Sequence, residues 1–178
     1  RVKDLKKFID TNNEFNKEDF KLKKDSLITS NKNDLKNANF YIVTVPTPVK
    51  KNNVPDLKYI KDAFNLISQY IKNGDIVFLE STVFPGTTEN ICKNIIRKKN
   101  KDIKFHIGYS SERINPGDKI HNIRNICKVV SIKDSPKIVQ SVKKIYKCIS
   151  KKVILTQKIK ETELSKLIEN TQRDLNIA

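Results

Sequence analysis

Residues 74–90 read GDIVFLESTVFPGTTEN, and the stretch changes character abruptly near its middle. It begins with the apolar run Ile76–Leu79, which is typical of a strand that is covered on both faces. Three polar residues, Glu80 to Thr82, follow at once, and a Pro-Gly pair then turns the chain toward a polar helix start. In open α/β sheets, ligands bind beyond the carboxyl ends of the strands. The stretch therefore predicts a buried strand that carries a threonine to a binding edge.

The rest of the chain continues an alternation of strands and helices around this stretch. The quoted strand is expected over 76–82, and further strands are expected at 27–29, 40–45, 105–109, 128–131 and 153–156. Helices with one apolar face are expected at 1–9, 57–72, 88–97, 136–149 and from 158 onward. Such alternation favours right-handed crossovers, so the sequence predicts an α/β fold with a mostly parallel sheet and flanking helices.

Polar residues also follow two other expected strands. Pro46-Thr47-Pro48 stops the strand at 40–45, and the series Ser110 to Arg113 follows the strand at 105–109. Thr82 and Glu112 are the candidate site residues of these ends. The alternative for Thr82 is a turn or capping residue that only satisfies backbone groups. The alternative for Glu112 is a solvated or paired surface carboxylate.

The last expected helix carries a second polar group. Lys166 and Asn170 are four residues apart and share one face, which Glu163 and Asp174 extend. A lysine beside an amide can hold a developing oxyanion or a catalytic water. Equally, such a polar helix face can simply be exposed to water. Three apolar residues occupy another face and are expected to pack: Leu164, Leu167 and Ile168.

Composition argues against several classes of function. A chain of 178 residues suits one domain, and its formal net charge of 36 − 20 = +16 comes almost entirely from scattered lysines. The sequence has no basic patch interleaved with aromatic residues and no arginine cluster, so nucleic-acid binding is not expected. No apolar run approaches the roughly 18 to 20 residues of a membrane span. With no signal peptide pattern either, a cytoplasmic protein is expected.

The positions of the cysteines and glycines bear on three kinds of site: disulfides, metal sites and dinucleotide sites. The three cysteines have no C-x-x-C spacing, so neither a disulfide framework nor a metal site is expected. The four glycines do not form the G-x-G-x-x-G motif by which a dinucleotide site is normally recognised. The chain begins at Arg1 and contains no methionine, which suggests part of a longer protein. From the residues alone, the prediction is an α/β domain with a cleft and no assigned reaction.

Five longer motifs occur in the order and spacing of a known enzyme family. They read FYIVTVPTPV, PDLKYI, GDIVFLESTVFPGTTE, GYSSERINPGDK and KLIENTQRDLNIA. With them the chain resembles the UDP-glucose/GDP-mannose dehydrogenase family over essentially its whole length. The motifs look most like the UDP-N-acetylglucosamine/galactosamine 6-dehydrogenase branch, which supplies uronic-acid precursors for Vi-type capsules and O-antigens. The resemblance implies an oxidoreductase with a Rossmann-like domain that binds NAD.

The resemblance also implies how the chain is divided. Residues 1–157 correspond to a partial NAD-binding domain whose first strand, Gly-rich loop and second strand would be missing. Residues 158–178 correspond to the start of a long central helix that links this domain to a UDP-binding domain and forms a homodimer core. The family's catalytic cysteine would lie outside this chain. The isolated chain is therefore expected to be inactive.

On the cofactor side, family roles carry over onto four positions. The resemblance implies that Pro46, Thr47 and Ser81 line the NAD site. It implies that Thr82 lies near the nicotinamide and the catalytic water, as both a cofactor-binding and a catalytic residue.

On the substrate side, the resemblance implies that Glu112 is the general base that hydrolyses a thioester intermediate. Lys166 and Asn170 would stabilise the oxyanion and position the substrate or water. The sugar nucleotide would be held by these three residues and by the loop residues Arg113, Ile114 and Asn115.

The implied reaction oxidises C6 of a UDP-N-acetylhexosamine from alcohol to acid for polysaccharide biosynthesis. Two hydrides would pass to two NAD molecules, by way of an aldehyde and a thioester on the cysteine. Pro116 stands where the UDP-glucose branch has a second glutamate, which favours the N-acetylhexosamine branch. The alternatives are a UDP-glucose or GDP-mannose substrate, and a non-catalytic basic binding module of the same fold.

Overall fold

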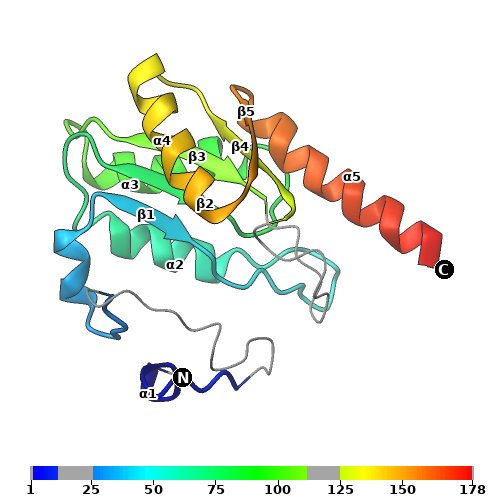
Figure 1. Cartoon of the computed structure of the whole chain (residues 1–178), viewed down its shortest axis with the longest axis horizontal. Coiled ribbons are helices and arrows are strands. Elements are labelled where there is room, and N and C mark those ends of the chain that lie inside the picture. Colours follow the sequence, from blue (N-terminus) through cyan, green and yellow to red (C-terminus); the bar gives the residue numbers. More distant parts are fainter. Residues whose placement is uncertain (1, 12–25, 112–124, 178) are drawn as a thin grey trace.

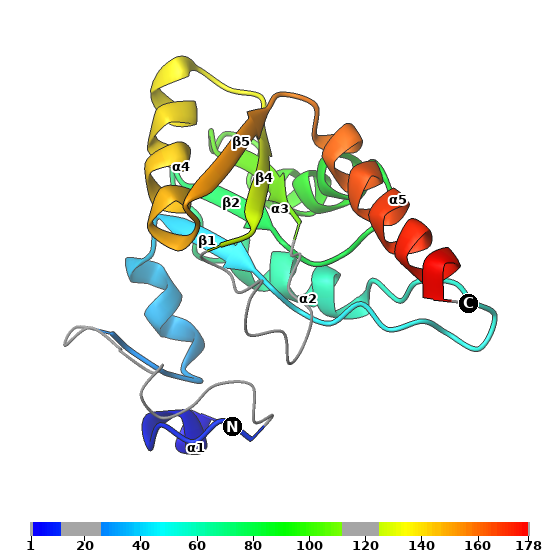
Figure 2. The same cartoon turned by 45° about the vertical axis from the view of Figure 1, so that its right-hand side comes forward.

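A five-stranded sheet with helices on both faces forms the body of the molecule, shown in Figures 1 and 2. The computed structural model describes residues 2–11, 26–111 and 125–177. The strands are β1 (Phe40–Val43), β2 (Ile76–Leu79), β3 (His106–Ser110), β4 (Cys127–Ile132) and β5 (Lys152–Thr156). The α-helices are α1 (Val2–Lys6), α2 (Lys58–Ile67), α3 (Lys93–Lys99), α4 (Pro136–Ile149) and α5 (Ile159–Ile177). A 3₁₀-helix, η2 (Lys32–Asn37), and a π-helix, η3 (Thr87–Cys92), complete the elements.

The strands lie in the sheet in the same order as in the chain, β1-β2-β3-β4-β5. The pairs β1/β2, β2/β3 and β4/β5 are parallel, whereas β3 and β4 are antiparallel. The prediction of an α/β fold with a mostly parallel sheet is confirmed. Within it, β1, β2 and β3 end on the same edge, where the sequence predicts the site.

Strand β2 is buried on both faces, as its apolar run predicts. Val77 and Leu79 belong to one hydrophobic cluster with residues of α2 and α3, and Phe78 belongs to a second cluster with Tyr146 of α4. Accordingly, α2 and α3 cover one face of the sheet and α4 the other (Figure 1). The Phe78 side chain lies tightly against the backbone of β3, because a Cβ on Gly108 would lie 2.3 Å from the Phe78 ring. Packing on both faces of β2 therefore holds the carboxyl end of this strand in a fixed place.

Several expected elements differ from the observed ones. The strand expected at 27–29 is wrong, because residues 26–31 have no regular structure and Leu27 is 69% exposed. Helix α2 ends at Ile67 rather than at 72, where the Ser68 hydroxyl donates a hydrogen bond to the Asn65 carbonyl at 2.7 Å. The helix expected at 88–97 begins as the π-helix η3 and runs to Lys99. The other strand and helix predictions hold to within three residues at each end, except that the helix expected at 1–9 is the short α1.

Helix α5 begins against the sheet and then extends away from it, as both views show (Figures 1 and 2). Its first half contacts β3 and β4, and Ile159 joins the hydrophobic cluster beneath α2. In the described ranges, no helix is long and apolar enough to cross a membrane.

Candidate functional site

A pocket lies at the carboxyl ends of β1 and β2, where the sequence predicts one. It has a volume of about 380 Å³ and is lined by Thr44, Val45, Thr47, Glu80, Ser81 and Thr82. The structure thus brings together three predicted cofactor-side residues, Thr47, Ser81 and Thr82, from two strand ends. Pro46 is exposed beside this lining and does not contribute to it.

Hydrogen bonds between the two strand ends shape this pocket. The Ser81 hydroxyl donates to the Val45 carbonyl at 2.6 Å, and the Glu80 amide donates to the Val43 carbonyl at 2.9 Å. The Ser81 hydroxyl is therefore occupied in holding the edge together. Thr82 is partly exposed at the pocket, and within the described ranges its hydroxyl makes no hydrogen bond. The alternative in which Thr82 only satisfies backbone groups gains no support from these contacts.

Glu80 is a pocket residue that sequence reasoning missed. One of its carboxylate oxygens lies 3.0 Å from the Lys128 ammonium, and the other accepts a hydrogen bond of 2.8 Å from the Tyr146 hydroxyl. Lys128, the second residue of β4, is only 1% exposed although its side chain carries a charge. A lysine inside a β-branched run was the available signal, because such a buried charge requires a partner. The contacts of Glu80 with Lys128 and Tyr146 fix the position of this carboxylate at the base of the pocket.

Helix α5 presents a buried polar face to the sheet. Its buried residues are Ile159, Thr162, Glu163 and Lys166, which repeat at the i, i+3, i+4 and i+7 spacing of one helix face. The interpretation of this face as water-exposed is therefore wrong for its first two turns. Asn170, one turn further, is partly exposed and accepts a hydrogen bond from Arg173 at 3.1 Å.

The apolar residues of the same helix behave in the opposite way. Leu164 is 44% exposed and Ile168 is 58% exposed. They line an open groove with Leu167 and Leu175. The expectation that Leu164 and Ile168 pack is not met within this chain, whereas Leu167 is partly buried. The buried face of the helix consists mainly of polar residues.

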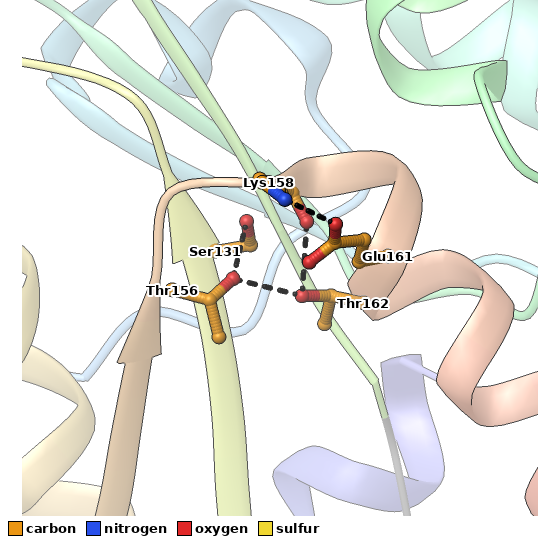
Figure 3. Close-up of polar contacts among 5 residues, drawn as sticks. All are labelled: Ser131, Thr156, Lys158, Glu161 and Thr162. Atoms are coloured by element: carbon orange, nitrogen blue, oxygen red, sulfur yellow. Dashed lines mark hydrogen bonds and ion pairs between the residues drawn. The ribbon is translucent and has the colours of Figure 1, made fainter.

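Thr162 anchors the polar face to the sheet through a series of hydroxyls (Figure 3). The Thr156 hydroxyl donates to Ser131 on β4 at 3.0 Å and lies 3.1 Å from the Thr162 hydroxyl. Near this link, Lys158 forms an exposed ion pair with Glu161 at 2.7 Å (Figure 3). The start of α5 is thereby tied to the ends of both β4 and β5.

Glu163 anchors the polar face on its other side. Its carboxylate accepts hydrogen bonds from the Gly86 amide, from the Thr88 amide at 2.9 Å and from the Thr88 hydroxyl at 2.7 Å. Nearby, burial and the Glu163 charge together raise the pKa of the Cys92 thiol to about 12. A thiol with such a pKa is neutral at physiological pH and is not a nucleophile. Cys92 is therefore not suited to act as a catalytic nucleophile.

Lys166 is 6% exposed, one turn after Glu163, and its ammonium lies 3.9 Å from the Glu169 carboxylate. The remaining predicted substrate-side residues are Glu112, Arg113, Ile114 and Asn115, and these lie outside the described residues. In the described part of the chain, no group of three or more His, Cys, Asp or Glu side chains is placed to hold a metal ion.

Comparison with known proteins identifies the family. The profile of the "UDP-glucose/GDP-mannose dehydrogenase family, NAD binding domain" matches residues 9–150. The chain belongs to this family. It is 41% identical over 184 residues to the UDP-N-acetyl-D-glucosamine 6-dehydrogenase of Salmonella typhi, covering 100% of this chain and 43% of that protein. It is 43% identical over 185 residues to Protein CapL of Staphylococcus aureus, covering 100% of this chain and 42% of that protein.

The fold is similar to solved members of the family. The UDP-D-ManNAc dehydrogenase of Pyrococcus horikoshii superposes with a TM-score of 0.74 at 30% identity, covering 84% of this chain and 36% of that one. The prediction of a Rossmann-like domain is confirmed. The chain spans less than half the length of the relatives that it matches.

The pocket fits part of the NAD that this family binds. It lies at the ends of adjacent parallel strands, where such sheets hold nucleotides. Its volume of about 380 Å³ is near the lower end of the roughly 300 to 1,000 Å³ typical of ligand pockets. It therefore suits one portion of a dinucleotide. Thr47 and Thr82 can offer hydroxyls to that portion, whereas the glycine motif that cradles the phosphates is not in the sequence.

Proposed function

We propose that this chain is the NAD-binding part of a nucleotide-sugar 6-dehydrogenase that acts on a UDP-N-acetylhexosamine. Oxidation of the C6 alcohol to the acid would consume two NAD⁺ and one water and release two NADH and two protons. The observation that carries the proposal is the burial of Lys166 on a helix anchored to the end of the sheet. The names of the relatives with 41% and 43% identity support the choice of reaction and a role in capsule-type polysaccharides.

Lys166 would bind the substrate and stabilise the negative charge that develops on the C6 oxygen. A cation shielded from water interacts with such a charge more strongly than an exposed one does. Asn170, four residues further on the same helix, would orient the substrate or the hydrolytic water through its amide. Bound NAD would supply the hydride acceptor.

Thr82 would act at the pocket, where its hydroxyl can contact the nicotinamide end of the cofactor and the water. Pro46, Thr47 and Ser81 would complete the cofactor side of the site. For Glu112 as general base, and for Arg113, Ile114 and Asn115 as sugar-nucleotide ligands, support comes from their motif alone.

We further propose that the open apolar groove on α5 is where a second copy of the protein packs in a cytoplasmic homodimer. The exposed groove residues Leu164, Ile168 and Leu175 support this proposal, together with the partly buried Leu167. Residues 158–178 would then begin a helix that links the NAD-binding part to the rest of the enzyme.

A chimera tests the proposed reaction. This chain replaces the aligned segment of the Salmonella typhi enzyme, and NADH formation is followed with UDP-N-acetylglucosamine and its galacto epimer. We expect two NADH for each sugar oxidised. The Lys166→Ala chimera should lose about 10²- to 10³-fold in kcat, the usual loss for one donor to an oxyanion.

A folded chimera that binds NAD but oxidises neither sugar would reject the proposal. Activity restricted to UDP-glucose or GDP-mannose would instead support the alternative substrates.

A further inference from the structure

Glu163 has no role in the proposed reaction, yet it is fully buried at 0% exposure. It lies three residues before Lys166 and seven before Asn170, so the three share one face of α5. A buried carboxylate is costly unless hydrogen bonds compensate it. The donors that compensate Glu163 all come from one segment, at the end of the loop that carries Thr82.

The carboxylate caps a helix that is distant in the sequence. Gly86 and Thr88 lie at the start of the continuous helical segment formed by η3 and α3, 75 or more residues before Glu163. The first amides of a helix have no partner inside it, and a negative charge is favourable there. The Glu163 carboxylate of α5 thus supplies the hydrogen-bond acceptor that the first amides of the η3/α3 segment lack.

The backbone at Gly86 is built for this contact. Its φ of +91° is a backbone conformation that residues other than glycine rarely adopt. A Cβ at this position would lie 2.9 Å from the side-chain nitrogen Nδ2 of Asn90 and 3.5 Å from Cε of Lys160, which is in the first turn of α5. The loop and the helix therefore meet closely, independently of the hydrogen bonds.

These contacts connect two parts of the site. Thr82 and Gly86 belong to one loop, residues 80–86, which we call the Thr82 loop; Glu163 and Lys166 belong to one turn of α5. We propose that Glu163 is a positioning residue whose carboxylate locks the Thr82 loop onto α5 and thereby holds Lys166 in its buried position. Thr162 secures the same turn to the sheet from the other side. The importance of this geometry for catalysis rests on the proposed function, but the geometry can be tested without catalysis.

The test measures how fast each lysine of the 178-residue chain reacts with an amine-specific acetylating reagent, by mass spectrometry. In the unaltered chain, Lys166 and Lys128, both buried, should react slowly, and exposed Lys158 should react fast. In Glu163→Ala, we expect the rate at Lys166 to rise about tenfold or more. Orphaning buried donors costs at least 1 to 3 kcal/mol, and about 1.4 kcal/mol corresponds to a factor of ten.

Lys128 is the internal control, because it is buried at a separate place under Glu80. Its rate should stay unchanged; a parallel rise at Lys128 and Lys166 would show general loosening and overturn the proposal. Glu163→Gln keeps the shape and one acceptor oxygen, so it should protect Lys166 to an intermediate degree even if the alanine variant unfolds. Glu161→Gln, which alters only the exposed ion pair with Lys158, should leave the rates at Lys166 and Lys128 unchanged.

Unchanged slow reaction of Lys166 in both Glu163 variants would also overturn the proposal. Because no catalysis is involved, these outcomes are separate from the activity of the chimera. A selective rise at Lys166 with an inactive chimera would retain the positioning role and reject the proposed reaction.

Discussion

Glu80, the first residue of the Thr82 loop, and Glu163, which contacts the end of that loop, are both buried carboxylates that the structure compensates in different ways. Glu80, at the end of β2, lies against the Lys128 ammonium and the Tyr146 hydroxyl. Glu163, on α5, accepts hydrogen bonds from two backbone amides and one hydroxyl. Glu80 depends on an opposite charge from β4, whereas Glu163 depends on the amides at the start of a helix. The comparison shows two ways to stabilise a buried glutamate: an ion pair with a lysine, and hydrogen bonds from the backbone amides at the start of a helix.

The largest effect is expected for Glu80→Gln, because it removes the carboxylate charge that faces the buried Lys128 ammonium at 3.0 Å. Breaking one side of a buried ion pair costs about 3 to 5 kcal/mol, and we expect about 3 because Glu80 borders the pocket. Urea unfolding of the variant measures this loss in the free energy of unfolding.

The matched control for Glu80→Gln adds Lys128→Met, which removes both charges. The double variant should recover more than half of the lost stability, since a buried pair replaced by neutral groups is often close to neutral. Equal losses in the single and double variants would show that the charge pair is not what holds this place together.

The intermediate effect is expected for Glu163→Gln, which has the same shape change as Glu80→Gln. One acceptor oxygen becomes a donor, so one hydrogen bond to the loop is lost while no lysine is left uncompensated. We expect a loss of about 1 to 2 kcal/mol, in line with one unsatisfied buried donor. The same urea experiment checks it, and a loss as large as that of Glu80→Gln would remove the distinction between the two carboxylates.

The smallest effect on stability at neutral pH is expected from the ionisation of Cys92, whose thiol lies near Glu163. Its pKa is raised from 9.0 to about 12, first by burial and then by the Glu163 charge. The neutral thiol is therefore favoured in the folded chain. The resulting stability is fully present below pH 9 and is lost as the pH rises from 9 toward 12.

Thiol alkylation at pH 8 checks the state of this cysteine. Cys148 is exposed and should react quickly, whereas buried Cys92 should remain unmodified. Glu163→Gln should leave most of this protection, because burial is the larger cause. Rapid alkylation of Cys92 in the folded chain would contradict its burial beside the helix.

Much of the site could be predicted from the sequence because it follows local rules. The apolar run of β2 gave a strand buried on both faces, and the polar residues after it had to appear at the ligand-binding edge of a parallel sheet. Thr47, Ser81 and Thr82 line the pocket at that edge. The spacing of Lys166 and Asn170 also placed them on one helix face. The family motifs added the roles, which remain proposals.

Other features could not be read from local pattern. The apolar residues of α5 were expected to pack, but the polar residues are the buried ones. Hydrophobic periodicity predicts a buried face only when apolar side chains form it. Here the buried face is largely polar: Glu163 accepts hydrogen bonds from a segment at least 75 residues away, and the Thr162 hydroxyl contacts that of Thr156. Burial of Lys128 likewise depends on Glu80, which is 48 residues away in the sequence.

The sequence by itself determined the alternation of strands and helices, the binding edge of the sheet and the family, because each depends on short-range periodicity or on contiguous motifs. Only the tertiary structure decided which polar groups are buried, how the Thr82 loop is joined to α5 and which face of that helix meets the sheet. These outcomes depend on pairing donors and acceptors across 48 to 77 residues of chain. A buried polar group is stable only when its partner arrives from elsewhere in the fold.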